Sequence, residues 1–252
     1  MTFWGVYKMR SWFKWIVCAW ILVWILPAQA NLKVGTVYFY PPFVTAANSG
    51  FDLDIIRIIC EKLRRDCEIV PMDYHELFPA LKQGTIDIAI GGITIYSKNS
   101  DKFIYSLPYM VSYGQFLIKN DSTLDTLSQL ADQRIGVIRG EEDGGVFYRY
   151  LKEKFTGQFK IEFYNDMEDL IEALKNSEVT AAFFHQSTAV YWVQNGGGQF
   201  KTLGKPMSVG QGIAIVASAK NAALIEQINT QIKRIDRDNR YLSLYQTYFG
   251  SL

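Results

Sequence analysis

Strand-like and helix-like segments alternate along this chain in two separate series, and this alternation limits the possible folds more than any other feature. In the first series we expect strands at 31–39, 67–74 and 86–92, with helices at 51–65 and 75–84 between them. The strand at 86–92 is mostly apolar, as is typical of a parallel strand buried on both faces. A β-α-β-α-β series predicts a largely parallel sheet with right-handed crossovers.

A second α/β series follows the first. Its expected strands lie at 113–120, 134–140, 160–164 and 180–185, and its expected helices at 127–133, 145–155 and 167–176. A strand at 210–218 and mostly helical sequence from 221 to 250 end the chain. Two such series predict two lobes, each a mainly parallel sheet flanked by helices. Ligands of open α/β sheets bind in a crevice beyond the carboxyl ends of the strands, so we expect a cleft there.

The first thirty residues have the pattern of a secretory leader. Three basic residues precede an uninterrupted apolar run at 15–26, and Ala28 and Ala30 form the small-x-small pattern of a cleavage site. The run is shorter than the roughly 20 residues that cross a bilayer as a helix. We therefore expect a signal peptide at 1–30, cleaved after Ala30, and a periplasmic protein; the alternative is an uncleaved anchor.

The charge of the remaining chain is nearly balanced. The leader holds three of the 26 Lys and Arg residues, which leaves 23 to face 25 Asp and Glu. A net charge near −2 gives no electrostatic case for binding nucleic acid or an anionic membrane surface. No later run is long and apolar enough to span a membrane, so a soluble mature protein is expected.

Two cysteines, Cys60 and Cys67, follow the leader. An even count in an exported chain favours a disulfide bond. Cys60 lies late in the expected helix at 51–65 and Cys67 opens the next strand, so a bond would tie the end of one to the start of the other. Two buried thiols that never meet are the alternative.

Motifs for covalent catalysis, metal binding and phosphate binding are absent from the sequence. There is no Gly-x-Ser-x-Gly elbow, and neither Cys60 nor Cys67 lies in a Gly-rich turn. His75 and His185 are the only histidines and belong to no metal-spaced cluster. No GxxxxGK[ST] motif occurs. We therefore expect no cofactor and no metal.

Residues at the carboxyl ends of strands in the first series are candidates for a ligand site. Tyr40 stands beside two prolines on a stiff turn, where its ring either stacks on a ligand or packs against the lobe. Gly91, Gly92 and Thr94 present backbone groups and a hydroxyl at the end of the strand at 86–92. Bare backbone at such a place allows a ligand to approach closely.

The second series offers three more candidates. Glu141 and Glu142 follow Gly140 and open a helix, where the helix dipole favours carboxylates in any case. His185 ends the strand at 180–185 and leads into a helix, and a structural role is the alternative for it.

Taken together, these segments resemble the extracellular solute-binding proteins of ATP-driven importers for polar amino acids. The resemblance runs from Val34 to Gly250 and is carried by "VGTVYFYPPF", "GFDLDIIRIICEKL", "LFPALKQGTIDIAIGGITI", "YSLPYMVSYGQFLI" and the tail "INTQIKRIDRDNRYLSLYQTYFG". The spacing of Cys60 and Cys67 is also that of the histidine and lysine/arginine/ornithine binders, in which these cysteines pair. The resemblance implies two lobes that close on a ligand around a two-stranded hinge.

By this resemblance, the hinge strands lie near Ser112–Gln115 and Val209–Gly212. The first lobe is expected to comprise residues 31–113 and 211–252, and the second lobe residues 114–210. Closure would bury the ligand and create the surface that the membrane transporter recognises.

The chain departs from the family at the residues that hold the ligand. Asn99 stands where family members carry an arginine that binds the α-carboxylate, and Glu141 and Glu142 replace two hydroxyl residues that add donors to it. His185 replaces the aspartate that takes the α-ammonium. Val37 replaces an acidic residue of the basic-amino-acid binders. Asparagine lacks the arginine's charge, and glutamates would repel a carboxylate.

These changes argue against a free α-amino acid held in the usual way. We expect a cationic, or neutral and polar, ligand that faces Glu141, Glu142 and Tyr40; in a shifted alignment, Lys98 replaces the missing arginine. The predicted ligand-binding residues are Tyr40, Tyr74, Gly91, Gly92, Thr94, Asn99, Glu141, Glu142 and His185.

The sequence thus predicts a periplasmic solute-binding protein that delivers a small polar solute to an inner-membrane ABC permease. It is expected to be a monomer that binds no nucleic acid. One alternative is an enzyme on the same scaffold, similar to the cyclohexadienyl dehydratases, with Glu141, Glu142 or His185 as the acid. Another alternative is a sensory module that docks on a membrane receptor.

Overall fold

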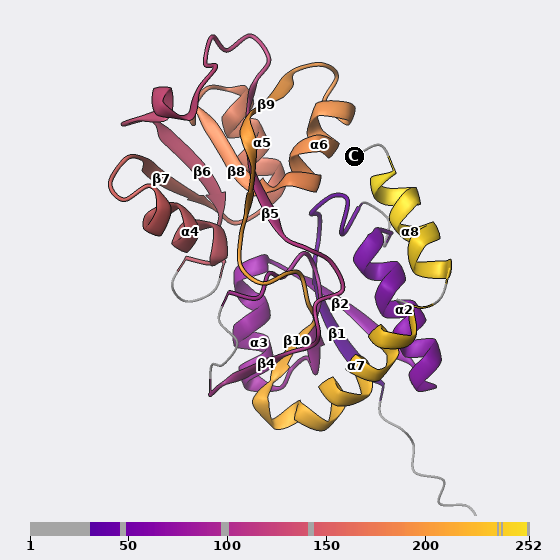
Figure 1. The fold of residues 1–252 in the computed structure, drawn as a ribbon. Coiled ribbons are helices and arrows are strands. Elements are labelled where there is room, and N and C mark those ends of the chain that lie inside the picture. The colour runs from indigo at the N-terminus through magenta and orange to yellow at the C-terminus, as the bar shows by residue number, and fades with distance from the viewer. Residues whose placement is uncertain are drawn as a thin grey trace, which may run out of the picture. The chain divides into compact units, whose positions relative to one another are not determined.

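Two five-stranded sheets form the fold (Figure 1). The computed structural model describes residues 31–45, 49–96, 101–140, 144–235, 237 and 239–250. The first sheet has the strand order β2-β1-β3-β10-β4, with β1 at Leu32–Val37, β2 at Cys67–Met72, β3 at Ile88–Ala89, β4 at Phe103–Tyr105 and β10 at Val216–Ser218. The second has the order β7-β6-β8-β5-β9, with β5 at Tyr113–Lys119, β6 at Arg134–Ile138, β7 at Lys160–Tyr164, β8 at Ala181–His185 and β9 at Phe200–Ser208. This agrees with the predicted two-lobed α/β fold.

Helices cover both sheets. The helices of the first sheet are α2 (Phe51–Leu63), α3 (Leu77–Gln83), α7 (Ala222–Ile235) and α8 (Asn239–Phe249). Those of the second are α4 (Val146–Lys154), α5 (Met167–Lys175) and α6 (Gln186–Asn195). Short 3-10 turns lie at Tyr74–Glu76, Leu127–Leu130 and Ala219–Asn221. In the first part, α2 packs against α7 and α8 (Figure 1), and in the second α5 and α6 pack on β8.

Helix α2 shows how the sequence produces this packing. Its apolar residues recur at helical spacing, so Leu53, Ile56, Ile59 and Cys60 are all buried. Leu63 in the last turn is only partly buried. The helix ends at Arg64, whose left-handed backbone turns the chain toward β2.

The sheets are more mixed than the expected mainly parallel arrangement. Strand β1 is parallel to β2 and β3, and β6 is parallel to β7 and β8. However, β10 is antiparallel to β3 and β4, and β5 is antiparallel to β8 and β9. The antiparallel strands are those that the chain enters or leaves when it passes from one sheet to the other. Strands β4 and β9 were not among the expected strands. Of the strand expected at 210–218, only Val216–Ser218 forms a strand of the sheet, and Ile213 makes isolated bridges to Thr94 and Met110.

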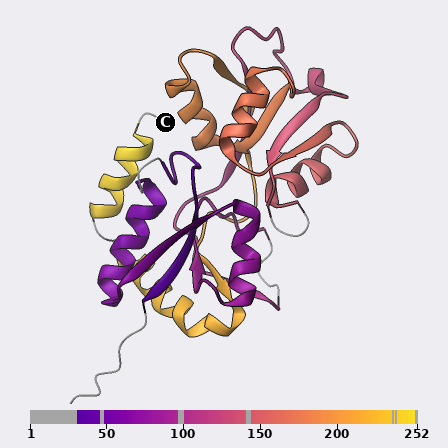
Figure 2. The same cartoon turned by 180° about the vertical axis from the view of Figure 1, so that it is seen from behind.

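Two segments connect the sheets, and we call 106–112 and 209–215 the crossing segments. They run side by side (Figures 1 and 2), because the N–H of Val209 donates to the Ser112 carbonyl at 3.1 Å and that of Ile213 to the Met110 carbonyl at 2.7 Å. The predicted hinge falls within or next to these segments. The lobe boundaries after residues 113 and 210 stay predictions.

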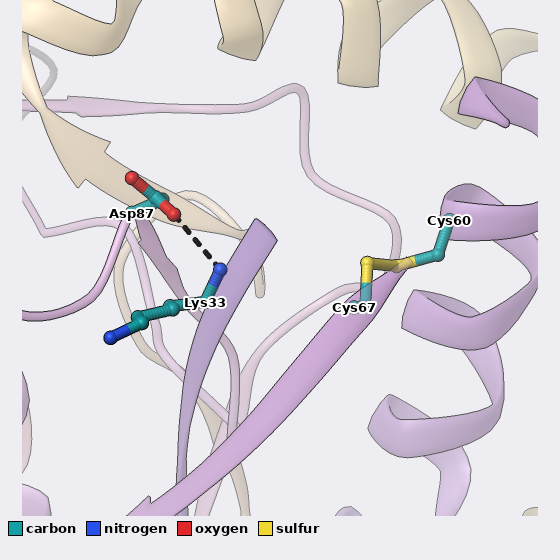
Figure 3. The surroundings of a disulfide bond; sticks show 4 residues. All are labelled: Lys33, Cys60, Cys67 and Asp87. Atoms are coloured by element: carbon teal, nitrogen blue, oxygen red, sulfur yellow. Dashed lines mark hydrogen bonds between the residues drawn. A yellow bond between two sulfur atoms is a disulfide. The ribbon is translucent and has the colours of Figure 1, made fainter. Parts of the chain in front are cut away.

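A disulfide bond joins Cys60 and Cys67, with a Cα–Cα distance of 6.2 Å (Figure 3). The bond ties the last turn of α2 to the first residue of β2, as the sequence predicted. Nearby, the N–H of Lys33 in β1 donates to a carboxylate oxygen of Asp87 at 2.8 Å (Figure 3). The disulfide bond thus joins β2 to α2, and the hydrogen bond joins β1 to the residue that precedes β3.

Candidate functional site

A tight backbone turn at the end of β3 forms the floor of the candidate site. Gly91 and Gly92 follow the strand with φ angles of 151° and 68°. A β-carbon on Gly92 would lie 3.0 Å from the ring of Tyr40, so this position has neither the backbone conformation nor the room for a side chain. The turn ends β3 earlier than the sequence predicted.

Beneath this turn lies the carboxylate of Asp52, in the first turn of α2. It is fully buried and accepts a hydrogen bond of 2.7 Å from the N–H of Gly92. Burial raises the pKa of the Asp52 carboxyl to about 7, although the N–H of Gly92, the Tyr109 hydroxyl and the N–H of Gly91 each act to lower it.

Above the turn lies His185, the last residue of β8 in the second sheet. Its Nε2 is 2.8 Å from the carbonyl oxygen of Gly92. A carbonyl only accepts hydrogen bonds, so Nε2 carries the proton. Burial lowers the pKa of His185 to about 4, and the hydrogen bond to the Gly92 carbonyl only partly opposes this effect. The imidazole is therefore neutral at pH 7.

Three aromatic rings surround this imidazole. Their centroids lie at 5.9 Å (Tyr40), 5.0 Å (Phe43) and 4.8 Å (Phe147) from that of His185, all edge to face. Phe147 comes from α4 and the other two from the turn after β1. His185 therefore joins residues of both sheets in one buried aromatic cluster.

Hydroxyl groups complete the cluster on the side of the crossing segments. The Thr94 Oγ1 lies 2.9 Å from the Ser112 Oγ and 3.5 Å from the His185 Nε2. Farther along, the guanidinium of Arg149 in α4 lies 4.6 Å above the ring of Tyr96. These contacts, like that of His185 with Gly92, link the strand end of the first sheet to the second part of the molecule.

A small cavity among the described residues touches both parts of the chain. Its volume is about 20 Å³, which is room for about one water molecule. Its lining residues are Val37, Tyr38, Phe39, Tyr40, Met72, Asp73, Tyr74, Ile138, Asn165, Asp166 and Met167.

Most of the predicted site residues that the structure describes meet here. Tyr40, Gly92, Thr94 and His185 are in one cluster, and Gly91 forms its floor. The Tyr74 ring lies 6.2 Å from that of Tyr40. The remaining predictions, Asn99, Glu141 and Glu142, lie outside the described residues. That any of these residues binds a ligand stays a prediction.

Sequence reasoning missed four residues of the cluster: Asp52, Phe43, Ser112 and Phe147. A signal existed for Asp52, which is a charged residue on the buried side of α2. Phe43 follows the two prolines next to Tyr40 and could have been grouped with it. Ser112 and Phe147 carry no local signal, since only the chain crossing and the placement of α4 bring them here.

Two absences bear on other functions. Among the residues that the structure describes, no group of His, Cys, Asp and Glu is arranged to hold a metal ion. Likewise, none of the helices in that part of the chain has the length and apolar character of a membrane span.

Comparisons with known proteins agree with this geometry. The chain is 25% identical over 229 residues to the ABC transporter arginine-binding protein 1 of Escherichia coli, covering 88% of this chain and 92% of that one. It is 25% identical over 234 residues to the arginine-binding periplasmic protein of Mannheimia haemolytica, with coverages of 90% and 94%.

A solved structure is similar over nearly its whole length. An arginine transport system periplasmic binding protein from Legionella pneumophila has a TM-score of 0.81 and 32% identity, covering 87% of this chain and 99% of that one. These relatives are binding proteins, so a binding role is favoured over the enzyme alternative. The sequence model of one family matches residues 32–251. The chain belongs to the bacterial extracellular solute-binding proteins, family 3.

Proposed function

We propose that this protein binds a small polar solute of amino-acid-like character, cationic or neutral, between its two sheets and delivers it to an ATP-driven inner-membrane importer. The observation that carries the proposal is the contact of His185 with Gly92, because it brings the carboxyl ends of β8 and β3 together. In open α/β sheets, this is where ligands bind. The names of the relatives, which specify arginine binding and ABC transport, support the same role.

The side chains around the small cavity favour a positively charged group on the ligand. Tyr40 and Tyr74 present aromatic rings, whose faces attract cations, and Asp73 and Asp166 supply carboxylates in the same lining. His185 is neutral and so carries no charge to hold an α-ammonium group. We infer that the ligand's cationic end, rather than its α-ammonium, gives most of the electrostatic recognition.

We infer that the cluster opens when a ligand enters. The bond from His185 to Gly92 joins the two sheets, so it breaks when they move apart. The ligand then shifts the balance between open and closed forms by binding the closed form better. The crossing segments are the proposed hinge.

Trp192 in α6 provides the test of binding. Its ring is 6.3 Å from that of Phe39, which lies in the turn after β1, so this contact spans the two parts of the chain. Cleavage after Ala30 would leave it as the sole tryptophan. Its emission is to be measured during titration with L-arginine, agmatine, putrescine, L-glutamine and L-glutamate, with Trp192→Phe as the control for signal.

We expect saturable changes with the cationic compounds, at one ligand per chain and without any product, and none with L-glutamate. Agmatine is L-arginine without its carboxylate, so the ratio of the two affinities reports the cost or benefit of that group. Tight binding of many ordinary α-amino acids, unchanged by Glu141→Gln, would contradict the proposed ligand class.

The cellular setting is part of the proposal. We infer that residues 1–30 are a cleaved signal peptide and that the mature monomer works in the periplasm beside its permease. Mass spectrometry of the protein released from the periplasm checks this, with an N-terminus at Asn31 as the expected result. Recovery of the protein only in the membrane fraction, with residues 1–30 attached, would show an anchor instead.

A further inference from the structure

Asp52 lies where no ligand can reach it, yet it contacts the turn that forms the floor of the site. Its carboxylate is buried below Gly91 and Gly92 and accepts the Gly92 N–H at 2.7 Å. The carbonyl of the same Gly92 accepts the proton of His185 Nε2 at 2.8 Å on the other side. Gly92 thus connects the buried carboxylate of Asp52 in α2 to the imidazole of His185 at the end of β8.

We propose that Asp52 is a positioning residue for the ligand site, whose carboxylate holds the Gly91–Gly92 turn so that the Gly92 carbonyl faces His185. The two glycines do not by themselves fix the conformation of this turn. Glycine has the greatest backbone freedom of any residue, and the φ of 68° at Gly92 is one of several conformations open to it. An acceptor under its N–H selects one of them. The inference rests on the proposed function, because it concerns the same site.

The carboxylate also connects this turn to a crossing segment. The Tyr109 hydroxyl interacts with Asp52, although the two do not complete a hydrogen bond of good geometry. The Tyr109 backbone is fixed in turn: its N–H donates to Ile213 at 2.9 Å, and its carbonyl accepts the Tyr241 hydroxyl at 2.6 Å. Asp52 therefore connects the floor of the site with the proposed hinge.

Few ionisable groups bear on this carboxylate. The Tyr109 hydroxyl acts directly, Tyr241 and Tyr74 act on Tyr109, and His185 lies beyond the Gly92 peptide. Burial raises the pKa of this carboxyl, and among the described residues no cation acts to lower it. Its hydrogen-bond partner is the Gly92 N–H, as expected for a group that orients a backbone turn.

Asp52→Asn tests the proposal, with Asp54→Asn as a matched control. Asp54 is on the same helix, but its carboxylate pairs with Arg57 and Tyr248, away from the site. Asparagine keeps the shape of Asp52 but points an amide donor at the Tyr109 hydroxyl or the Gly91 N–H. The readouts are NMR titration of the His185 ring, in a His75→Gln background, and amide exchange of Gly92.

With Asp52→Asn we expect the His185 titration midpoint to rise by at least one pH unit, because the ring leaves its buried contact with Gly92. Exchange of the Gly92 amide should become at least tenfold faster. Asp54→Asn should change neither. A folded Asp52→Asn protein with the wild-type His185 midpoint and Gly92 exchange would overturn the proposal.

A second variant, Tyr109→Phe, tests the proposal if the Asp52→Asn protein does not fold. Tyr109→Phe leaves the carboxylate and the ring in place and removes only the hydroxyl, and we expect a smaller rise of the His185 midpoint; no rise would overturn the proposal. Both readouts use the free protein, so they do not depend on the ligand screen. A screen without any binding would refute the proposed function while leaving the NMR result to decide the role of Asp52.

Discussion

The N–H and the carbonyl of Gly92 are held in different ways. On the side of the first sheet, Asp52 takes the N–H and further bonds join its surroundings to the crossing segment and α8. On the side of the second sheet, the His185 ring meets the carbonyl, the Thr94 Oγ1 lies 3.5 Å from its Nε2, and its other neighbours are aromatic edges. The first contact lies within the first sheet and its helices, whereas the second joins the two sheets.

This difference indicates which half of the site is rigid. The bond from Gly92 to Asp52 lies within the first sheet and its helices and need not break when the sheets separate, whereas the bond from His185 joins the two sheets and must break. The floor at Gly91 and Gly92 should therefore stay formed when the two sheets separate, while His185 moves away. Opening then costs the contacts of His185 with Gly92 and Thr94 and the ring contacts, and the ligand can replace them.

The largest expected effect comes from disturbing both sides at once with Gly92→Ala. The new β-carbon would meet Tyr40 at 3.0 Å in a backbone conformation that alanine avoids, so we expect a loss of about 3 kcal/mol in the free energy of unfolding. Gly157→Ala is the control, with a similar φ of 69° but nothing within 4 Å. Its loss should be about 1 kcal/mol in urea denaturation. Equal losses would show that the contact with Tyr40 does not matter.

The next effect tests the first side alone. Replacing Cys60 and Cys67 with serine removes a short covalent ring, which we expect to lower the free energy of unfolding by about 2–3 kcal/mol. The bond lies at the far end of α2 from Asp52, so ligand affinity should change less than about twofold. Wild-type protein kept in reductant is the control for the substitution itself. A large loss of affinity would mean that the floor is less independent than proposed.

Asp52 and His185 should affect the pH dependence of the free energy of unfolding in opposite directions. The pKa of Asp52 is raised to about 7, so its contribution to stability is lost as pH rises from about 4 to 7. The pKa of His185 is lowered to about 4, so its contribution is lost as pH falls from about 6.5 to 4. The two slopes oppose each other in the window they share, and their sum should be nearly flat in the wild type.

His185→Gln removes one of these slopes. Its free energy of unfolding should then fall by about 2 kcal/mol as pH rises from about 4.5 to 6.5, measured by urea denaturation at several pH values. His75→Gln, which changes the histidine outside the site, should keep the wild-type profile. A profile of His185→Gln that also stays flat would mean that Asp52 does not titrate as described.

The smallest effect concerns the hydroxyl pair beside His185. Ser112→Ala leaves the buried Thr94 hydroxyl without its 2.9 Å partner, which should cost about 1 kcal/mol. Combining it with Thr94→Val should cost less than the sum of the two single changes, as a double-mutant cycle of denaturation curves would show. Thr247→Ala on the exposed side of α8 should cost less than about 0.5 kcal/mol. Additive losses would indicate that the pair contributes no energy of its own.

Much of the fold could be read from local sequence, but the site only partly so. The apolar spacing in α2 and the alternating series identified the elements, and Cys60 with Cys67 gave the disulfide. Strand β9 was missed because its sequence, "FKTLGKPMS", is polar and broken by glycine and proline. Phe147 joins His185 only through the packing of α4, which no local pattern encodes. Asn99 depends on an alignment, and the structure does not describe it.

The closed imidazole contact at Gly92 has a kinetic consequence for the proposed ligand. If a solute enters only while His185 is detached, the rate of association levels off at the opening rate as solute concentration rises. The apparent dissociation constant is then the intrinsic one divided by the open fraction. An open fraction of about 1% would thus weaken apparent binding about a hundredfold. A substitution that merely loosens His185 could strengthen uptake of the solute without adding a single contact to it.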